Sequence, residues 1–445
     1  MSMEDSASRP EVHLAAYKLG YRELGSIFAC FSHLLLRHAN QLGSRRLAFV
    51  SRDGDLLMRC AKRLAERIED IDRPTFSFSY VYISRQSSFL PALDAIDKTT
   101  LESALELRGE RATLAAALTY LGMPLAPIAS VLARLVIDPE RSDISPDTIA
   151  VLIADEQFRF AVRREGDRQR TLLAAYLEQE HIGNGVATLL VDIGWRGSIL
   201  TNIKSAFSGT PAFNPPAGAF LGLWSEGKAL SGFPTGTVGL LADIRRRRNV
   251  LEASAWLAAF LLEAVCRANE GTTVGYEFRG GKVMPILASD TESRRAEQRV
   301  LPLIVEIRRG IMDFIDEHGA SDEWLTASSD QLRSRAQRSL LRLACFPRAE
   351  EIAVGARLVH TEGHTPDWWT HLIDSTGIGP LSHPRRWLAG LASPWRAGYI
   401  RQTGGPVLAA GFLLLESALL AVSPNVRSTL SRMARRATGG TLRPS

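Results

Sequence analysis

The sequence has little cysteine: only four occur in 445 residues, and no two of them are spaced as Cys-x-x-Cys. Such isolated cysteines support neither a disulfide framework nor a structural zinc site. We therefore expect reduced thiols and a cytoplasmic location. The polar, acidic first residues, MSMEDSASRPEV, also differ from a secretory signal peptide.

Several motifs of well-known enzymes are also absent. No Gly-x-Gly-x-x-Gly follows the first predicted strand and no P-loop occurs, which excludes the standard dinucleotide and P-loop sites. There is no Gly-x-Ser-x-Gly elbow and no His-Glu-x-x-His. A loose polar group near the C-terminus matches no known metal-ligand spacing, so we interpret its members as loop residues. They are His360, Glu362, His364, Asp367, His371 and His383.

A long membrane-spanning run is absent as well. The longest apolar stretch, Pro406–Val422, is short for a span and contains Glu416. Two interpretations stay open, a buried helix and an interfacial helix. Arginines flank the stretch and keep peripheral contact with the inner membrane face through 406–422 open as an interpretation. They are Arg396, Arg401, Arg427 and Arg432.

The charge of the chain is mildly positive, with a net charge of +5 and a pI near 9.1. Arginines cluster at Arg245–Arg248 and around Arg432–Arg436, where phosphate or acidic lipid could bind. A solvated face is the more common role of such clusters. We expect no nucleic-acid partner.

An apolar content of 45% with 23% charged residues is typical of a globular protein. The length predicts two or three packed units. Four short apolar runs predict strands: Leu47–Val50, Ser77–Ser84, Ala187–Val191 and Ala217–Trp224. A helical pattern follows the first run at once, so 45–85 is typical of a βαβ unit.

We therefore predict an α/β fold with a Rossmann-like, mostly parallel sheet in residues 13–248. Helical patterns over about 92–182 predict a large helical insertion between the second and third strands. Residues 249–445 are predicted to be mainly α-helical, with a small β-hairpin at about 274–287. We expect helices over 251–267, 296–318, 330–345 and 406–422.

The first strand ends in polar residues, Ser51-Arg52-Asp53-Gly54-Asp55. In an open α/β sheet, ligands bind beyond the carboxyl ends of the strands. Arg52 could hold a phosphate or carboxylate, and Asp53 could act as a base or a metal ligand. Gly54 is expected to permit a backbone conformation closed to other residues. The structural alternative is that Ser51 or Asp53 only caps the helix and pairs with Arg52, while Asp55 is a charge at the helix N-terminus.

The third strand ends in a second polar group that begins at Asp192. Asp192 is a second candidate catalytic acid. The two glycines would let the backbone approach a ligand. The Trp could stack on a sugar or base, and its alternative role is to close the edge of the core. The other members of the group are Gly194, Trp195, Arg196, Gly197 and Ser198.

A third, weaker group follows the second strand, with Ser84, Arg85 and Ser88. Parallel strands bring their carboxyl ends to one sheet edge, so we predict a single pocket for all three groups. Mg²⁺ is the cofactor that these acids would hold, although their spacing fixes no metal.

Several stretches resemble the C-terminal half of predicted haloacid-dehalogenase-superfamily hydrolases, which are encoded with glycosyltransferases in bacterial surface-polysaccharide clusters. The resemblance rests on FVSRDGDLL, YVYISRQSSFLPAL, LLVDIGWRGSIL and EGTTVGYEFRGGKVMPI, and it covers roughly residues 17–400. It implies a phosphorylated sugar or nucleotide sugar as ligand and a glycosyltransferase as partner. That family's phosphatase domain opens with an Asp-x-Asp nucleophile motif and is missing here. Leu56-Leu57 follow Asp55, so the resemblance does not carry nucleophile chemistry to Asp53.

Two main hypotheses follow from these observations. The first is a hydrolase or transferase of a phosphorylated sugar, with Asp53 or Asp192 as base, nucleophile or Mg²⁺ ligand. The second is a non-catalytic accessory module that docks on glycosyltransferases or on the inner membrane face. A phosphoribosyltransferase-like sheet is a third, weaker interpretation, because the paired acids of such enzymes are absent.

Overall fold

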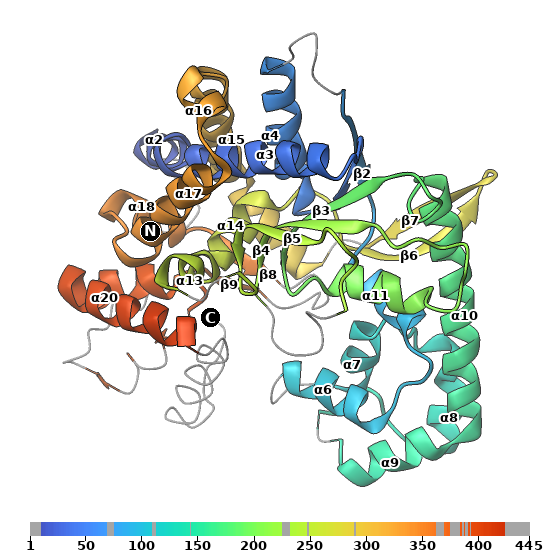
Figure 1. The fold of residues 1–445 in the computed structure, drawn as a ribbon. Coiled ribbons are helices and arrows are strands. Elements are labelled where there is room, and N and C mark those ends of the chain that lie inside the picture. The colour runs from blue at the N-terminus through green and yellow to red at the C-terminus, as the bar shows by residue number, and fades with distance from the viewer. Residues whose placement is uncertain are drawn as a thin grey trace.

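The computed structural model covers the whole chain, and we describe the residues that it places well. These are residues 10–68, 75–108, 113–142, 144–224, 232–246, 249–288, 291–361, 369–373, 383–384, 387, 390–391 and 393–422. Within these ranges the protein is a mixed α/β structure with one five-stranded sheet and two small two-stranded sheets (Figure 1).

The large sheet is entirely parallel, in the order β2-β1-β3-β4-β5. Its strands are short and rich in apolar residues, as expected for strands that are covered on both faces. Helix α4 joins β1 to β2, and helix α11 joins β3 to β4. The bounds are β1 (Arg46–Val50), α4 (Gly54–Arg67), β2 (Ser77–Val81), β3 (Thr188–Trp195), α11 (Ser198–Ala206), β4 (Ala217–Leu223) and β5 (Val238–Asp243).

Alternating side chains of the strands enter two different hydrophobic layers. Leu47 and Phe49 of β1 join the large core that also contains residues of α3 and α4. Ala48 and Val50 join the layer on the other face, with residues of α10 and α11. This alternation follows from the two-residue period of a strand. The sheet is therefore the middle layer of a three-layer arrangement, and its carboxyl edge is held from both sides.

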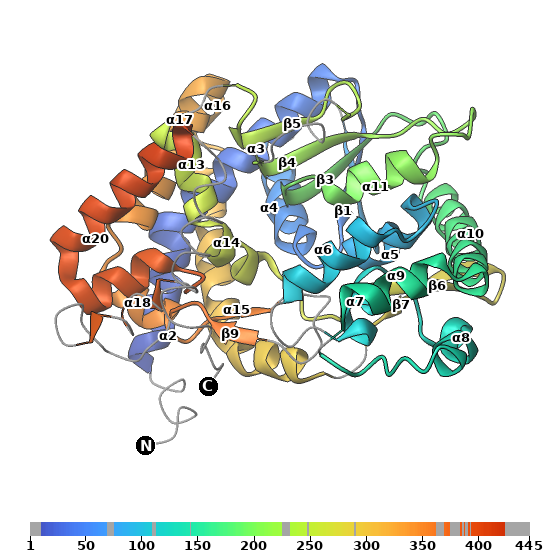
Figure 2. The ribbon, with the colours of Figure 1, turned by 90° about the horizontal axis from the view of Figure 1, so that it is seen from below.

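The predicted insertion between β2 and β3 is helical and has a hydrophobic cluster of its own. Figures 1 and 2 place its short helices on one side of the sheet and the C-terminal helices on the other. Its elements are α5 (Arg85–Phe89), η2 (Leu90–Ala92), α6 (Lys98–Arg108), α7 (Leu114–Tyr120), η4 (Ala126–Ile128), α8 (Ala129–Arg134), α9 (Pro146–Ala154) and α10 (Glu156–Gln179).

The C-terminal region is mainly helical and shares the large core with the N-terminal helices, which pack on α15 and α17. The N-terminal elements are α2 (Pro10–Leu19), η1 (Gly20–Leu24) and α3 (Gly25–Gln41). The C-terminal elements are α13 (Val250–Leu257), α14 (Ala259–Cys266), β6 (Thr273–Arg279), β7 (Lys282–Leu287), α15 (Glu292–His318), α16 (Asp322–Thr326), α17 (Ser329–Cys345), α18 (Ala349–Gly355), β8 (Val359–Thr361), β9 (Trp369–His371) and α20 (Arg396–Val422).

The predicted fold class is confirmed: the chain has a Rossmann-like parallel sheet, a helical insertion and a helical C-terminal region with a hairpin. The single helix predicted over 251–267 is two helices, α13 and α14, with a break at Ala258. Among the described helices, none is both long enough and apolar enough to cross a membrane.

Candidate functional site

The strand order places a topological switch point between β1 and β3. The chain leaves β1 toward β2 on one side and later returns to β3 on the other side. In doubly wound sheets of this order, the crevice beyond the carboxyl ends at the switch point is where ligands bind. Asp53 follows β1, and Asp192 lies near the carboxyl end of β3. Both predicted acids therefore lie at the expected edge of the sheet.

Asp53 occupies the N-cap position of α4, but its side chain makes no capping hydrogen bond. The alternative that Asp53 is only a helix cap is therefore not what the structure shows. Burial raises the pKa of the Asp53 carboxyl, and the charges of Arg267 and Arg52 lower it by less. A half-buried carboxyl that has a perturbed pKa and does not cap its helix is a recognised sign of a functional site.

Asp192 is the second half-buried acid at this edge. Its Oδ1 accepts a hydrogen bond of 2.8 Å from the backbone N–H of Ile193. Burial and then the charge of Asp53 raise the pKa of Asp192 to about 7, against a smaller lowering effect of Arg85. The two carboxyls are thus electrostatically coupled, and Asp192 exchanges its proton near neutral pH.

The backbone is strained beside both acids. Arg52, directly before Asp53, has a left-handed φ of 70°, and Trp195 has a φ of 64°. The N–H of Arg52 donates to the Tyr80 hydroxyl (2.6 Å), and its carbonyl accepts from the N–H of Ala268 (3.0 Å). Non-glycine residues in this conformation cluster at functional sites, where surrounding contacts hold them in place. Gly54, which was expected to take the unusual conformation, lies within regular α4 instead.

The guanidinium of Arg52 is held inside the protein rather than offered to a ligand. It pairs with Glu297 (2.6 Å) and donates to Thr272 (2.7 Å). The same carboxylate forms ion pairs with Arg267 (3.2 Å) and Arg294 (3.3 Å). We call Arg52, Arg267, Arg294 and Glu297 the Glu297 cluster. The predicted phosphate contact of Arg52 is therefore corrected: its charge acts on Asp53 from within this cluster.

The Glu297 cluster was not predicted from the sequence. Arg267 ends a strongly apolar helical stretch. A charged residue at such a position is the only feature of the local sequence that marks Arg267 as unusual. Glu297 lies on an amphipathic helix whose pattern does not single it out. Three guanidinium groups around one carboxylate leave excess positive charge beside Asp53, which favours binding of an anion.

Two serines that were predicted to contact a ligand instead form hydrogen bonds within the protein. The Ser51 hydroxyl donates to the carbonyl oxygen of Ile83 (3.2 Å), so it ties the end of β1 to the segment after β2. The Ser84 hydroxyl caps α5 by accepting from the N–H of Ser87 (3.0 Å) and donates to the carbonyl of Thr273 (2.5 Å). Both hydroxyls position the edge of the sheet, which corrects their predicted contact with a ligand.

The Trp195 ring lies in the core, 5% exposed, with its centroid 5.6 Å from that of Trp256. The structure therefore supports the alternative role of Trp195, which is to close the edge of the core, and not the predicted stacking on a sugar. Gly194 and Gly197 have φ angles of 94° and 62°. A Cβ on Gly194 would lie 2.6 Å from the Cβ of Phe220, so close packing against β4 accounts for a glycine at this position.

We use the term rim for Arg85, Arg196 and Ser198, which follow the carboxyl ends of β2 and β3. The two arginines are exposed at the ends of β2 and β3, and Ser198 is the half-buried first residue of α11. Arg85 is close enough to Asp192 to lower its pKa. These three residues, with Asp53 and Asp192, are the predicted site residues that remain available to a ligand.

The donor set is compatible with Mg²⁺ but not with an all-protein metal cage. In the described ranges, no three His, Cys, Asp or Glu side chains are grouped as metal ligands. Mg²⁺ is often held by one or two carboxylates together with substrate phosphates, and Asp53 and Asp192 offer that number. In the predicted His-rich region, residues 362–368 lie outside the described residues.

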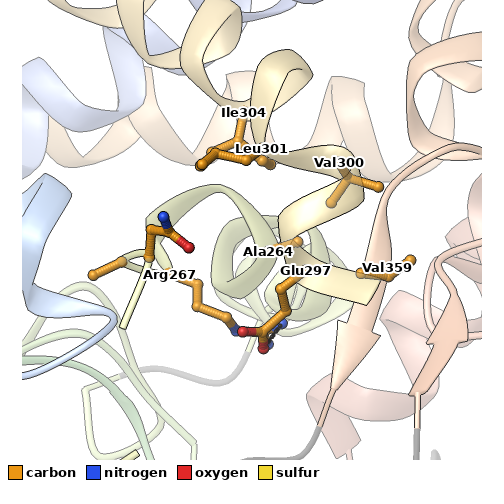
Figure 3. Close-up of a pocket in the computed structure, with 9 residues that line it drawn as sticks. Ala264, Arg267, Glu297, Val300, Leu301, Ile304 and Val359 are labelled. Carbon is orange, nitrogen blue, oxygen red and sulfur yellow. Dashed lines mark ion pairs between the residues drawn. The ribbon is translucent and has the colours of Figure 1, made fainter. Parts of the chain in front are cut away.

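A small cavity lies beside the Glu297 cluster (Figure 3). Its wall is mostly apolar, with Val300, Leu301 and Val359, and its only charged lining residues are Arg267 and Glu297. The dashed ion pair in Figure 3 shows that these two charges satisfy each other. Neither candidate acid lines this cavity, so we locate the site by the switch point and the coupled acids instead.

No protein-family model matches the chain, and no curated protein matches its sequence. The functional argument therefore rests on the chemistry of the edge of the sheet. Two coupled carboxyls, one of which is partly protonated at neutral pH, can give and take protons in one reaction. The positive charges of the Glu297 cluster and of Arg85 and Arg196 favour an anionic substrate.

Proposed function

We propose that this protein is a haloacid-dehalogenase-like hydrolase or transferase of surface-polysaccharide biosynthesis that acts on a phosphorylated sugar or nucleotide sugar. The observation that carries the proposal is the coupling of Asp53 and Asp192 at the switch point of the sheet. The resemblance of the strand-end segments to glycosyltransferase-associated hydrolases supports the substrate class and a glycosyltransferase partner.

In the proposed reaction, Asp53 accepts a proton from water as the water oxygen attacks phosphorus. Protonated Asp192 donates its proton to the sugar oxygen as the phosphorus–oxygen bond breaks. One water is consumed, and the proton taken up by Asp53 returns to Asp192, directly or through solvent, before the next turnover. A pKa of about 7 suits Asp192 to this acid role, because efficient proton donors titrate near the working pH.

The rim of the site supplies the binding contacts of the proposal. Arg85 and Arg196 contact the phosphate oxygens, and Ser198 at the N-terminus of α11 offers hydroxyl and backbone donors. Binding of Mg²⁺ by Asp53 and Asp192 would require both carboxyls to be ionised, so the metal would then replace the acid role of Asp192 by neutralising phosphate charge. The Glu297 cluster keeps positive charge behind Asp53 without occupying the space of the substrate.

A second candidate function is a non-catalytic accessory module that binds the same sugar phosphate and presents it to a glycosyltransferase. The observation that favours it is that Arg52, a predicted ligand contact, is committed to Glu297. A module of this kind needs the positive rim but no proton transfer.

The decisive experiment is a panel of sugar phosphates and nucleotide sugars with and without Mg²⁺, measured for phosphate release and for binding. We expect turnover by the wild type and a loss of at least about 100-fold in Asp53→Asn and Asp192→Asn, as is common for a lost general acid or base. Asp330→Asn, which changes a 92% exposed side chain, is the matched control. Equal turnover in all variants would remove both acids from the mechanism. Binding without turnover by the wild type would establish the accessory module.

A further inference from the structure

Helix α20 has two faces of different character in its second half. The helix contains a non-helical residue, Gly405, with a φ of 79°, so Pro406–Val422 runs as a separate segment after a kink. On the inner face, Ala409 and Leu413 are buried where α20 packs on α13 and α17. This contact fixes the segment to the body of the protein and leaves its other face outward.

The outer face is aliphatic and exposed. Val407 is 85% exposed and Leu415 is 59% exposed. Leu408, Leu414 and Leu419 are exposed as well, and with Val407 and Leu415 they fall on one side of the segment. Single exposed leucines are ordinary on a protein surface, but a continuous aliphatic stripe marks an interaction surface. Both Figure 1 and Figure 2 show α20 at the edge of the molecule.

The only acidic residue of the segment is withdrawn from this face. Glu416 is buried and pairs with Arg396, which lies before the kink of the same helix. The pair closes the two halves of α20 on each other and keeps the carboxylate inside. The outward stripe from Val407 to Leu419 therefore presents no negative charge.

The sequence around the stripe is positively charged. Arg401 precedes it, and residues 423–445 contain no acidic residue and five arginines, Arg427, Arg432, Arg435, Arg436 and Arg443. Basic residues near an anionic bilayer are attracted to its surface. A second copy of this chain would bring a second set of the same charges, which repel one another. An acidic lipid surface complements both the aliphatic stripe and the arginines.

We propose that the outer face of α20, from Val407 to Leu419, docks on the surface of an anionic phospholipid bilayer. The leucines enter the boundary between headgroups and acyl chains while the inner face stays packed on α13 and α17. This is peripheral binding and needs no spanning helix. It goes beyond the proposed reaction and does not rest on it, because the switch-point acids take no part.

The test is sedimentation of the full chain with vesicles of phosphatidylcholine alone and with 30% phosphatidylserine. We expect binding only to the phosphatidylserine vesicles and loss of most of that binding in 0.5 M salt. The double variant Leu415→Gln and Leu419→Gln should bind at least about tenfold more weakly, since both substitutions remove aliphatic surface that leaves water on binding. Val151→Gln, an exposed apolar position on α9 far from α20 in both views, is the matched control and should bind as the wild type does.

Three results would overturn the proposal. One is no binding of the wild type to phosphatidylserine vesicles at low salt. Another is equal binding by the wild type and the double variant. The third is a wild-type dimer in light scattering that the double variant converts to a monomer, because a second copy would then cover the stripe. Circular dichroism of the variants checks that they fold. None of these results bears on the proposed turnover of sugar phosphates, which is tested separately.

Discussion

Asp53 raises the pKa of Asp192 across the boundary between β1 and β3, the two strands at the switch point of the sheet. Burial has the larger effect on Asp192, and the charge of Asp53 comes next. Two acids in such an arrangement do not ionise independently. The relationship is therefore measurable without knowledge of a substrate.

The first prediction is that Asp53→Asn lowers the pKa of Asp192. The substitution removes the negative charge that opposes ionisation of Asp192, while burial continues to keep its pKa above the ordinary value of 3.8. Carboxyl-carbon NMR titration of labelled protein measures the shift. Asp330→Asn, at an exposed position on α17, should leave the Asp192 titration unchanged. An unchanged titration in Asp53→Asn would show that the two acids are not coupled.

The second prediction concerns the pH dependence of stability. The pKa of Asp192 is about 7 in the folded protein, against an ordinary value of 3.8. Between pH 3.8 and pH 7 the folded protein retains a proton on Asp192 that the unfolded chain has lost. The stability that Asp192 contributes to the folded state is therefore fully present below pH 3.8 and is lost as pH rises through 7. The free energy of unfolding of Asp192→Asn minus that of the wild type should thus rise by up to about 4 kcal/mol between pH 4 and pH 8.

Urea unfolding of the two proteins at several pH values measures this difference. The comparison removes the contributions of titrating groups that do not interact with Asp192, because both proteins share them. A constant difference over this range would mean that Asp192 titrates at its ordinary pKa and is not poised as an acid.

Much of the fold is predictable from the sequence because its strands are short apolar runs that end abruptly in polar residues. Leu47–Val50 before Ser51 has this form, and so does the run Ala187–Val191 before Asp192, although β3 continues past the predicted end to Trp195. The same abrupt ends expose the two acids, since parallel strands share their carboxyl edge. The position of the acids thus follows from local pattern.

The electrostatic surroundings of the acids do not follow from local pattern. Glu297 contacts Arg52 over a separation of 245 residues, and Arg308 contacts Asp55 over 253. Such pairs depend on how α15 packs against α2, α3 and α4, which no local periodicity encodes. For the same reason, the sequence could not show that the Arg52 guanidinium pairs with Glu297 or that the Trp195 ring packs in the core.

The third prediction is that Glu297→Gln destabilises the protein by about 3 to 5 kcal/mol, the usual cost of leaving buried charges unpaired. The substitution keeps the shape of the side chain but removes the charge that balances Arg52, Arg267 and Arg294. Glu306→Gln on the same helix breaks a more exposed pair with Arg309 and should cost less than about 1 kcal/mol. Equal losses in chemical denaturation would mean that the Glu297 cluster behaves as a surface ion pair.

The fourth prediction separates two reasons for a glycine at position 194. Gly194 and Gly185 have similar left-handed φ angles, 94° and 86°, but only Gly194 lacks room for a Cβ, which would lie 2.7 Å from the carbonyl oxygen of Gly222. Gly185→Ala should therefore cost only the conformational strain, about 1 to 2 kcal/mol. Gly194→Ala adds a clash with β4 and should cost about 3 kcal/mol or more in urea unfolding. If both variants lose the same stability, packing against β4 is not the reason for the glycine, and the approach of a ligand to the backbone beside Asp192 becomes the better explanation.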